Sequence, residues 1–402
     1  MQKSWLAALL VLVLAACSNV SIAPTSASTQ QATVEGTYIA VLADGASFGP
    51  QVAALEARHG VSVQASDRLQ AVNAVILRGL ARAKADQISK DPAVVAFSAD
   101  AEVHATAQTT PWGISRVGAD TTTAKGAGVA VYVVDTGIKV GHEDLGNLKG
   151  GYAVVTCKGK CAAAYDDDNG HGSHVAGTVA ATNNTVGVVG MAPQADLWAV
   201  KVLSRSGSGT ISGIVQGINW VISHNNGGKP KVINMSLGGT GSDDQDGLYC
   251  PATRSSNGFH NVIQKAVCDN NITVVVAAGN DGQDAALHTP AAYDEVITVS
   301  ATKQGDDWPS WSNWGHDVDI AAPGVSILST WNTSTTAYNT ISGTSMASPH
   351  VAGAAAVVLS ANPGYTPAQV KTALLNNAES TSGWTNTSGN PHPEPFLNVR
   401  GF

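Results

Sequence analysis

The chain has 402 residues, a formal net charge of −8 and 42 glycines. Charged side chains make up 13% of it and hydrophobic ones 44%, whereas about 25% of residues are charged in an average soluble domain. This composition excludes a disordered chain, a coiled coil and collagen, and the negative charge without a basic tract argues against nucleic acid as a partner.

Residues 1–17 are predicted to be an export signal. One lysine precedes an apolar stretch that is too short to span a bilayer, which takes a helix of about 20 residues. The signal ends in Leu-Ala-Ala followed by Cys17, which resembles the lipobox of bacterial lipoproteins, where the cysteine carries the lipid. The alternative is an ordinary signal peptide that is cut slightly later. Residues 18–34 are uncharged and rich in Ser, Thr, Ala and Gln, which is typical of a flexible tether.

The pattern then changes to that of a small α+β unit, residues 35–107. The predicted strands are 38–42, 72–77 and 92–97, and the predicted helices are 50–60 and 83–89. A unit of about 70 residues folds only marginally by itself. Small and polar residues at 105–111 interrupt the pattern, so we place a domain boundary there and assign residues 108–402 to a second domain.

Apolar strand candidates alternate with helical stretches in residues 108–402. The clearest strands are 129–134, 196–202, 232–235, 272–278 and 296–299, and the clearest helices are 172–181, 211–223, 259–270 and 346–360. Continuous apolar strands separated by helices predict an α/β fold with a mainly parallel sheet covered on both faces. Ligands bind beyond the carboxyl ends of such strands, and Asp135 and Asn280 directly follow apolar runs.

Three local patterns each place a polar residue at the start of a run of small residues. They are Val-Asp-Thr-Gly around Asp135, Asn-Gly-His-Gly-Ser-His around His171, and Gly-Thr-Ser-Met-Ala-Ser-Pro-His around Ser345. A helix that begins at such a Ser or His places this side chain beside unpaired N–H groups that favour developing negative charge. Taken singly, these residues and Asn280 are more often turn, loop or capping residues. Their joint occurrence is what indicates catalysis.

The order Asp135, His171, Ser345 is that of the subtilisins. With Asn280 preceded by Ala-Ala-Gly, residues 108–402 resemble a subtilisin-family serine peptidase. Two runs are similar to the proteinase K branch: Ala-Ala-Gly-Asn, which ends at Asn280, and Leu-Ser-Arg-Ser-Gly-Ser-Gly, which begins at residue 203. The resemblance implies a subtilisin-like three-layer fold with a mainly parallel sheet between helices, preceded by a small α+β pro-domain.

The resemblance also implies the roles of these residues in peptide hydrolysis through an acyl-enzyme. Ser345 is the nucleophile, His171 transfers the proton, and Asp135 orients the imidazole. The Asn280 amide and the Ser345 N–H stabilise the oxyanion. His174 and His350 lie inside small-residue helices, where we expect a packed, hydrogen-bonded structural role.

Two glycine-rich segments match the edges between which these enzymes clamp an extended peptide as a β-strand, and accessible backbone suits such pairing. The segments comprise Ser206, Gly207, Ser208 and Gly209, and Ser236, Leu237, Gly238 and Gly239. The wall of the first subsite combines the second segment with Ala277, Ala278 and Gly279. A small, uncharged wall favours apolar or aromatic side chains, although Asp243, Asp244 and Asp246 follow closely in the sequence and could add acidity.

Four cysteines follow Cys17, an even number in an exported chain, and they permit three pairings. We favour Cys157–Cys161 and Cys250–Cys268, because both disulfides close short local loops. A catalytic thiol has no support, since no cysteine lies in a matching Cys/His motif.

No cofactor is expected for the chemistry. For structural calcium, the resemblance to the proteinase K branch points to the carbonyls of Asp294 and Val296 and the carboxylate of Asp319. The alternative is a solvated acidic surface, which we favour for Asp166–Asp168. Zinc has no support, because the His-Glu-x-x-His pattern is absent from the sequence.

The pro-domain is expected to be an intramolecular inhibitor, with Glu102–Ala107 in the active cleft until autocleavage near Ala107–Gln108. If Cys17 is acylated, this cut leaves the lipid on the pro-domain and frees the protease. The sequence thus predicts a secreted, monomeric endopeptidase that acts on proteins and peptides. Its precursor is expected to be attached to a membrane only through that lipid. The alternatives are an inactive subtilisin-like binding protein of the cell envelope and, with less support, a lipase-type hydrolase, whose Gly-x-Ser-x-Gly elbow is not matched.

Overall fold

The structure is a computed structural model that describes residues 33–45, 47–101 and 108–402, which form two compact units, 33–101 and 108–402. The predicted signal, the tether, Cys17 and the segment Glu102–Ala107 lie outside the described residues. In the part of the chain that is described, no helix has both the length and the apolar character needed to cross a membrane.

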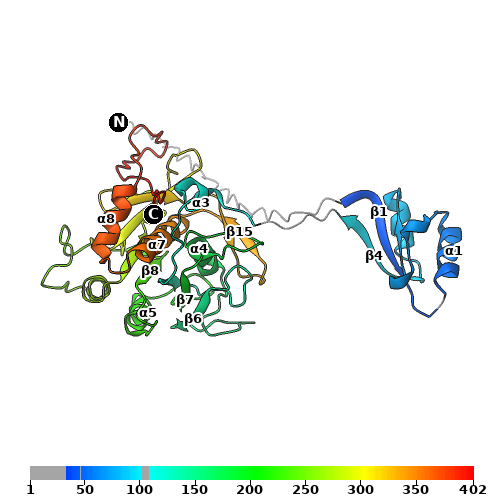
Figure 1. The fold of residues 1–402 in the computed structure, drawn as a ribbon, viewed down its shortest axis with the longest axis horizontal. Helices are drawn as coiled ribbons and strands as arrows, with labels where there is room; N and C mark the ends of the chain where they lie inside the picture. Colours follow the sequence, from blue (N-terminus) through cyan, green and yellow to red (C-terminus); the bar gives the residue numbers. More distant parts are fainter. Residues whose placement is uncertain (1–32, 46, 102–107) are drawn as a thin grey trace, which may run out of the picture. The chain divides into compact units, whose positions relative to one another are not determined.

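The first unit is a four-stranded antiparallel sheet with two helices (Figure 1). Its elements are β1 (Thr33–Leu42), α1 (Phe48–His59), β2 (Arg68–Leu69), β3 (Ala74–Leu77), α2 (Arg82–Ile88) and β4 (Val94–Ala101), with the strands in the order β2-β3-β1-β4. Apolar side chains from both helices and from the long strands, Leu42, Leu55, Leu77 and Ile88 among them, form its core. The three strands and two helices predicted here all form, and only the short β2 was not predicted.

The second unit is built on a seven-stranded sheet in which every neighbouring pair of strands is parallel. The strands are β5 (Ala130–Asp135), β6 (Leu148–Ala153), β7 (Asp196–Lys201), β8 (Lys231–Met235), β10 (Thr273–Ala277), β12 (Ile297–Thr302) and β13 (Ile320–Pro323). They lie in the order β13-β12-β10-β8-β5-β7-β6. The predicted fold class, a mainly parallel α/β sheet, is confirmed.

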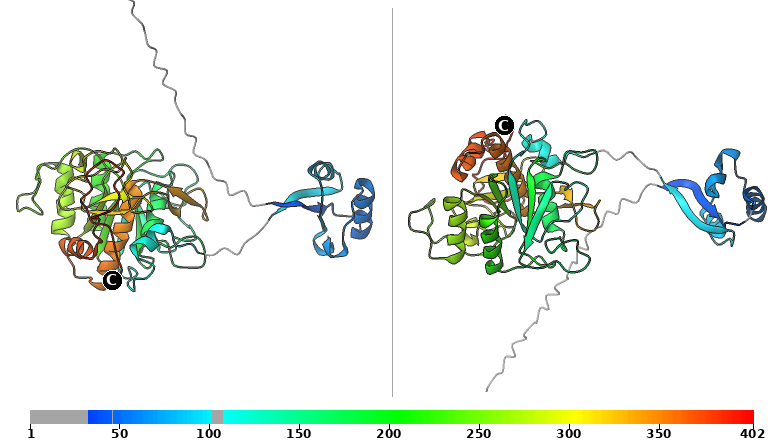
Figure 2. Two further views of the ribbon diagram at one scale, coloured as in Figure 1. Left: turned by 90° about the horizontal axis from the view of Figure 1, so that it is seen from above. Right: turned by 60° about the horizontal axis from the view of Figure 1, so that its bottom comes forward.

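Helices cover both faces of this sheet, which gives three layers (Figures 1 and 2). The helices are α3 (Trp112–Val117), α4 (His171–Ala180), α5 (Ile211–Ser223), α6 (Gly258–Gln264), α7 (Thr344–Ala361) and α8 (Pro367–Asn377). Alternate residues of β5 belong to different cores: Val131 and Val133 pack with α4 and α7, whereas Tyr132 and Val134 pack with α5 and α6. A strand that is buried on both faces has to be apolar throughout, which is why β5 is an unbroken apolar run.

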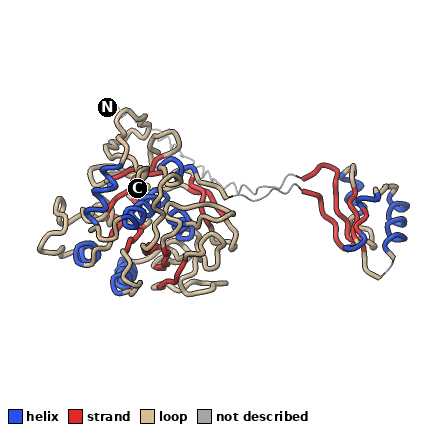
Figure 3. The backbone as a smooth tube through the Cα atoms, in the orientation of Figure 1, coloured by secondary structure: helices blue, strands red, loops and turns tan. Residues whose placement is uncertain are grey.

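Several elements depart from the predicted pattern. The helix expected over 259–270 ends at Gln264 and continues as a π-helical turn, Lys265–Asp269. Strand β6, which contains two glycines, and the short β13 were not predicted, because neither forms a long apolar run. Two short antiparallel ribbons, β9 (Gly239–Thr240) with β11 (His288–Thr289) and β14 (Ile327–Thr330) with β15 (Tyr338–Ile341), lie among the loops that make up much of the unit (Figure 3).

Candidate active site

The polar residues singled out from the sequence meet at the carboxyl edge of the parallel sheet. Asp135 is the last residue of β5, Ser236 directly follows β8, and Asn280 lies shortly after β10. His171 and Ser345 stand in the first turns of α4 and α7. Since β5, β8 and β10 are neighbours and parallel, their carboxyl ends lie side by side, where ligands bind in such sheets.

Asp135 holds the imidazole ring of His171. The carboxylate is buried, and its Oδ1 and Oδ2 lie 2.8 and 3.0 Å from His171 Nδ1. The N–H of Thr136 donates to the same Oδ1 at 2.6 Å. Burial lowers the pKa of His171, but the charge and hydrogen bond of Asp135 raise it by more, so this pKa lies above its ordinary value. With Nδ1 bound to Asp135, Nε2 is the nitrogen that is left to take up a proton.

The run Asp166–Asp168 is buried, so the solvated surface expected for it is wrong. Asp167 accepts hydrogen bonds from N–H groups at the start of α4 and therefore caps this helix. Asp168 lies 2.7 Å from the ammonium of Lys201, whose side chain is fully buried and also donates to the carbonyl of Thr136. These contacts fix the turn that follows β5. Their partners are distant in sequence, and the aspartate run itself carries no sign of them.

Ser345 is tied to Ser236 by two hydrogen bonds. Its Oγ donates to the Ser236 carbonyl at 3.3 Å, and Ser236 Oγ donates to the Ser345 carbonyl at 2.9 Å. The second bond compensates for Pro349, which lies one helical turn later and has no N–H to offer the Ser345 carbonyl. Among the described residues no hydrogen bond joins Ser345 to His171, and in substrate-free enzymes such a bond is often long.

Asn280 is oriented by Thr344. The N–H and hydroxyl of Thr344 donate to Asn280 Oδ1 at 2.8 and 3.0 Å, so Nδ2 is directed away from this contact as a donor. A Cβ placed on Gly343 would lie 3.6 Å from Ser345 N and 3.7 Å from Asn280 Nδ2. Gly343 therefore leaves open a small space beside two N–H donors. An oxyanion in this space could accept hydrogen bonds from both donors.

Asn313 supports the loop that carries Asn280. It is buried, its Nδ2 donates to the Ala278 carbonyl at 2.9 Å, and its Oδ1 accepts from N–H groups that follow Asn280. Gly279 has a φ of 110°, and a side chain there would come within 2.4 Å of Asn313 Nδ2, so this position requires glycine. Neither Asn313 nor Thr344 was predicted to be a site residue. Thr344 stood inside the Ser345 motif, whereas nothing around Asn313 distinguishes it.

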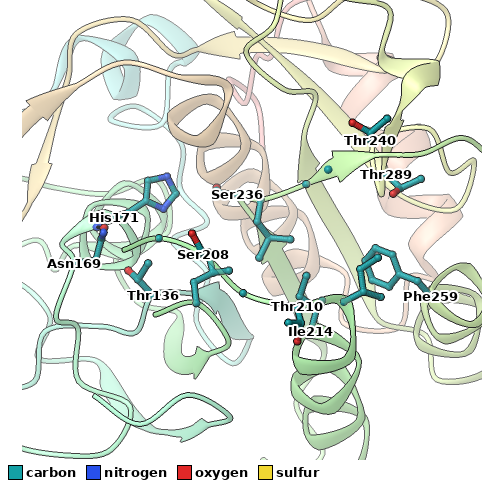
Figure 4. A pocket seen from close by; sticks show the side chains of 17 residues that line it. Thr136, Asn169, His171, Ser208, Thr210, Ile214, Ser236, Thr240, Phe259 and Thr289 are labelled. Atoms are coloured by element: carbon teal, nitrogen blue, oxygen red, sulfur yellow. Dashed lines mark hydrogen bonds between the residues drawn. The ribbon is translucent and has the colours of Figure 1, made fainter. Parts of the chain in front are cut away.

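Two cavities border the segment Ser236–Gly239. The first, of about 660 Å³, extends from His171 and Asn169 at one end to Phe259 at the other (Figure 4). Its long sides come from the two predicted substrate edges, with Ser208 opposite Ser236. The second cavity, of about 500 Å³, reaches Ser345 and Asn280.

The cavities bring together most of the predicted substrate-binding residues. Gly207, Ser208, Gly209, Ser236, Leu237, Gly238 and Gly239 line the first cavity, and Leu237, Gly238, Gly239, Ala277, Ala278 and Gly279 line the second. Ser206 lines neither, and its hydroxyl instead bonds Ser204 at 2.8 Å. Asp281, which was not predicted to be a site residue, also lines the second cavity, and its side chain is largely exposed.

His174 and His350 have the structural role expected of them. His174 Nε2 lies 2.9 Å from the Ile327 carbonyl oxygen, and His350 Nδ1 lies 2.8 Å from that of Met346. Burial lowers the pKa of His174 to about 3 and that of His350 to about 4. Both rings are therefore neutral near pH 7.

Asp243 and Asp244 line neither cavity, and both contact the ring of His260. The ring of His260 is buried, with Nδ1 2.7 Å from Asp244 Oδ1 and Nε2 2.9 Å from Glu295 Oε2. Asp243, Asp244 and His260 bring ligand atoms within 4.8 Å of one another, as a metal site would. The His260 nitrogens are, however, already engaged by Asp244 and Glu295. Burial lowers the pKa of His260, but these carboxylates raise it by more, so the net direction is upward.

The cysteines form Cys157–Cys161 and Cys250–Cys268, the two pairs favoured from the sequence. The first closes a loop before the aspartate run, and the second joins the loop before α6 to the π-helical turn after it.

The oxygens expected to bind calcium converge as the resemblance implied, but around a lysine. Lys371 Nζ lies 2.7 Å from Asp319 Oδ1, 2.9 Å from the Val296 carbonyl and 3.4 Å from the Asp294 carbonyl. An ion at this point would coincide with the ammonium group, so the residues as arranged do not fit calcium.

Comparison with known proteins agrees with this geometry. The profile of the Subtilase family matches residues 126–393. The extracellular serine proteinase of Thermus sp. (strain Rt41A) is 41% identical over 404 residues, which cover 91% of this chain and 92% of that protein. Subtilisin E of Bacillus subtilis (strain 168) is 42% identical over 298 residues, 73% of this chain and 72% of the relative.

Among solved structures, the crystal structure of a cold adapted subtilisin-like serine proteinase matches with a TM-score of 0.59 at 37% identity, covering 70% of this chain and 92% of that one. The chain therefore belongs to the subtilase family and is a subtilisin-type serine endopeptidase.

Proposed function

We propose that Asp135, His171 and Ser345 hydrolyse peptide bonds and that Asn280 supplies an oxyanion donor. The observation that carries this proposal is the hydrogen-bonded Asp135–His171 pair at the same sheet edge as Ser345. The open space at Gly343 between two N–H donors supports it independently. Placement in the proteinase K branch of the family stays a prediction from the sequence motifs.

In this mechanism Ser345 Oγ attacks the substrate carbonyl while His171 Nε2 takes its proton. The carboxylate of Asp135 stabilises the imidazolium that forms, and the oxyanion accepts hydrogen bonds from Asn280 Nδ2 and Ser345 N. His171 then gives its proton to the leaving amine as the C–N bond breaks, which leaves an acyl-enzyme. Water then attacks this ester while His171 takes its proton. His171 returns the proton to Ser345 Oγ as the C–O bond to the serine breaks, which releases the peptide acid and regenerates the free serine.

A fluorophosphonate probe tests the nucleophile directly, because it reacts with an activated serine without requiring turnover. We expect it to label the wild-type chain and not Ser345→Ala. Ser342→Ala is the matched control: it removes an exposed serine hydroxyl nearby and should leave labelling intact. A wild-type chain that is not labelled would instead indicate an inactive subtilisin-like binding protein.

The substrate is proposed to bind as an extended strand between Ser206–Gly209 and Ser236–Gly239. The second cavity is the candidate first subsite, because it reaches Ser345 and has alanine and glycine walls that leave room for a large apolar or aromatic side chain. Its carboxylate, Asp281, is largely exposed and lies 4.0 Å from His288, which leaves it poorly placed to select a cation. Phe and Leu esters should therefore be cleaved faster than Arg and Lys esters, and the opposite order would reject this preference.

Residues 35–107 are proposed to be an inhibitory pro-domain that the enzyme removes near Ala107–Gln108. The support is the family assignment together with a first unit that has its own core. Wild-type chain should shorten to a product that begins near residue 108, and Ser345→Ala should remain full length. A Ser345→Ala chain that still processes itself would refute autocatalysis.

We also propose that the enzyme is exported and that a lipid on Cys17 would stay with the released pro-domain. The support is the signal-like sequence of residues 1–17 and a relative that is named an extracellular serine proteinase. Palmitate label should appear on the precursor and be lost from the mature enzyme. Label that follows the mature enzyme would contradict this route.

A further inference from the structure

We propose that the ammonium group of Lys371 takes the place of a metal ion at the site formed by Asp294, Val296 and Asp319. This part of the fold is then held together without calcium. Two carbonyl oxygens and one carboxylate oxygen converge on Nζ, at 3.4, 2.9 and 2.7 Å.

The chemistry of an ammonium group suits this set of oxygens. It has three N–H donors and no acceptor, and it meets three oxygen acceptors. Calcium prefers six to eight oxygens at about 2.3–2.6 Å, so an ion that used the same three oxygens would have to displace the lysine. The second carboxylate oxygen of Asp319 accepts from the N–H of Thr298 at 2.9 Å, which leaves the carboxylate fixed in place.

The position of Lys371 follows from the way α8 is anchored. Thr366 and Gln369 form a capping box at its first turn, and Val370 and Leu374 are buried in the main core. Lys371 therefore starts from a fixed backbone and reaches the segments that lead into β12 and β13. Its ammonium joins α8 to both strands, as a bound cation would join its ligands.

The same chain uses a lysine in this way a second time. Lys201 Nζ lies 2.7 Å from Asp168 Oδ1 and 3.0 Å from the Leu203 carbonyl, and it also donates to the Thr136 carbonyl. Each ammonium thus meets one carboxylate oxygen and two carbonyl oxygens. A tethered cation of this kind stays in place at any calcium concentration, whereas an ion is lost by mass action when calcium falls.

The test removes the lysine and asks whether calcium binding appears. The full-length chain with Ser345→Ala is the parent, because it cannot digest itself during the measurement. Bound ⁴⁵Ca²⁺ per chain is measured by equilibrium dialysis, and the unfolding midpoint is measured in chelator and in millimolar calcium. Adding Lys371→Ala should raise the stoichiometry by one ion, and adding Asp319→Asn to that variant should abolish the gain.

Thermal unfolding provides the second readout. In chelator, Lys371→Ala should unfold at a lower temperature than the parent. Millimolar calcium should raise the unfolding temperature of Lys371→Ala by more than it raises that of the parent. Lys229→Ala is the matched control, since it removes a lysine that pairs with Asp196 at the surface and should gain no ion.

Two results would overturn the proposal. One is a Lys371→Ala variant that folds and binds no additional calcium. The other is a parent chain that loses a calcium ion on Asp319→Asn alone, which would mean that the ion displaces Lys371 in the native protein. The second comparison does not use Lys371→Ala, so it decides the question even if that variant fails to fold.

Discussion

Replacing Gly343 with alanine should separate catalysis from stability at this site. The added methyl would lie 3.6 Å from Ser345 N and 3.7 Å from Asn280 Nδ2, which are ordinary van der Waals distances. An oxyanion sits about 2.7–3.1 Å from its donors, so the methyl would fill most of the space that the oxyanion needs. The φ of Gly343 is 160°, an extended conformation that alanine also adopts.

The expected magnitudes follow from this geometry. Loss of one oxyanion donor costs about 10²–10³ in kcat, and the methyl obstructs two, so we expect kcat to fall by at least that factor. The free energy of unfolding should change by less than about 1 kcal/mol, because alanine at a compatible glycine position restricts the unfolded chain without straining the native one. KM should change little, since these donors act mainly in the transition state.

The assay compares the mature wild-type and Gly343→Ala enzymes, with the variant processed by added wild-type enzyme and then separated from it. A chromogenic peptide gives kcat and KM, and thermal unfolding gives stability. Gly364→Ala is the control, because a Cβ there meets nothing within 4 Å. A Gly343→Ala enzyme with kcat within tenfold of wild type, or one whose loss of activity follows a loss of folded protein, would refute the reasoning.

Three further predictions follow from the contacts described above. Because Asp135 raises the pKa of His171, kcat/KM should rise with pH through an apparent pKa above the ordinary histidine value of about 6.5. Asp135→Asn should shift this rising limb of the pH profile to lower pH and cut kcat by about 10⁴. A rising limb that does not move in the variant would contradict the assignment. Ser236→Ala leaves the Ser345 carbonyl without its donor, so we expect a loss of about 1–3 kcal/mol in denaturant unfolding and a lower kcat, whereas unchanged values of both would show that this bond is dispensable. Because the pKa of His260 is raised, its ion pairs stabilise the fold fully below the unfolded-state pKa, and this contribution is lost as pH rises through the raised folded-state pKa. In denaturant unfolding of the inactive Ser345→Ala chain, His260→Asn should therefore cost more stability at about pH 6 than at about pH 9. An equal or larger cost at the higher pH would argue against a charged His260.

The parts of the fold that the sequence predicts are those with continuous local patterns. Strands such as β5 and β10 are unbroken apolar runs because both faces are buried, and α5 forms over the predicted residues 211–223. The same logic locates Asp135 and Asn280, since a polar residue directly after a buried run marks the functional edge of a parallel sheet. Strand β6 was missed because glycine replaces apolar residues where Trp198 and Tyr165 pack against it.

What the sequence could not predict depends on contacts between distant residues. Asp168 is buried against Lys201, which lies 33 residues later in the sequence, and an isolated aspartate run indicates a surface far more often. The calcium prediction used three residues within one stretch of sequence, whereas the group that meets them, Lys371, comes from a helix much later in the chain. The resemblance to the proteinase K branch pointed to the oxygens that converge, but the nature of the cation among them depends on the rest of the fold.

The pairing of Ser236 with Ser345 links substrate binding to the nucleophile. Pro349 leaves the Ser345 carbonyl without its helical partner, and Ser236 can supply the donor because it stands at the end of β8. The segment that begins at Ser236 also borders both cavities. A peptide that pairs with this segment would therefore contact the same short stretch of chain as Ser236, whose hydroxyl donates to the Ser345 carbonyl. Binding of an extended backbone and positioning of the nucleophile then share one short piece of chain, so substitutions at Ser236 should alter kcat as well as KM.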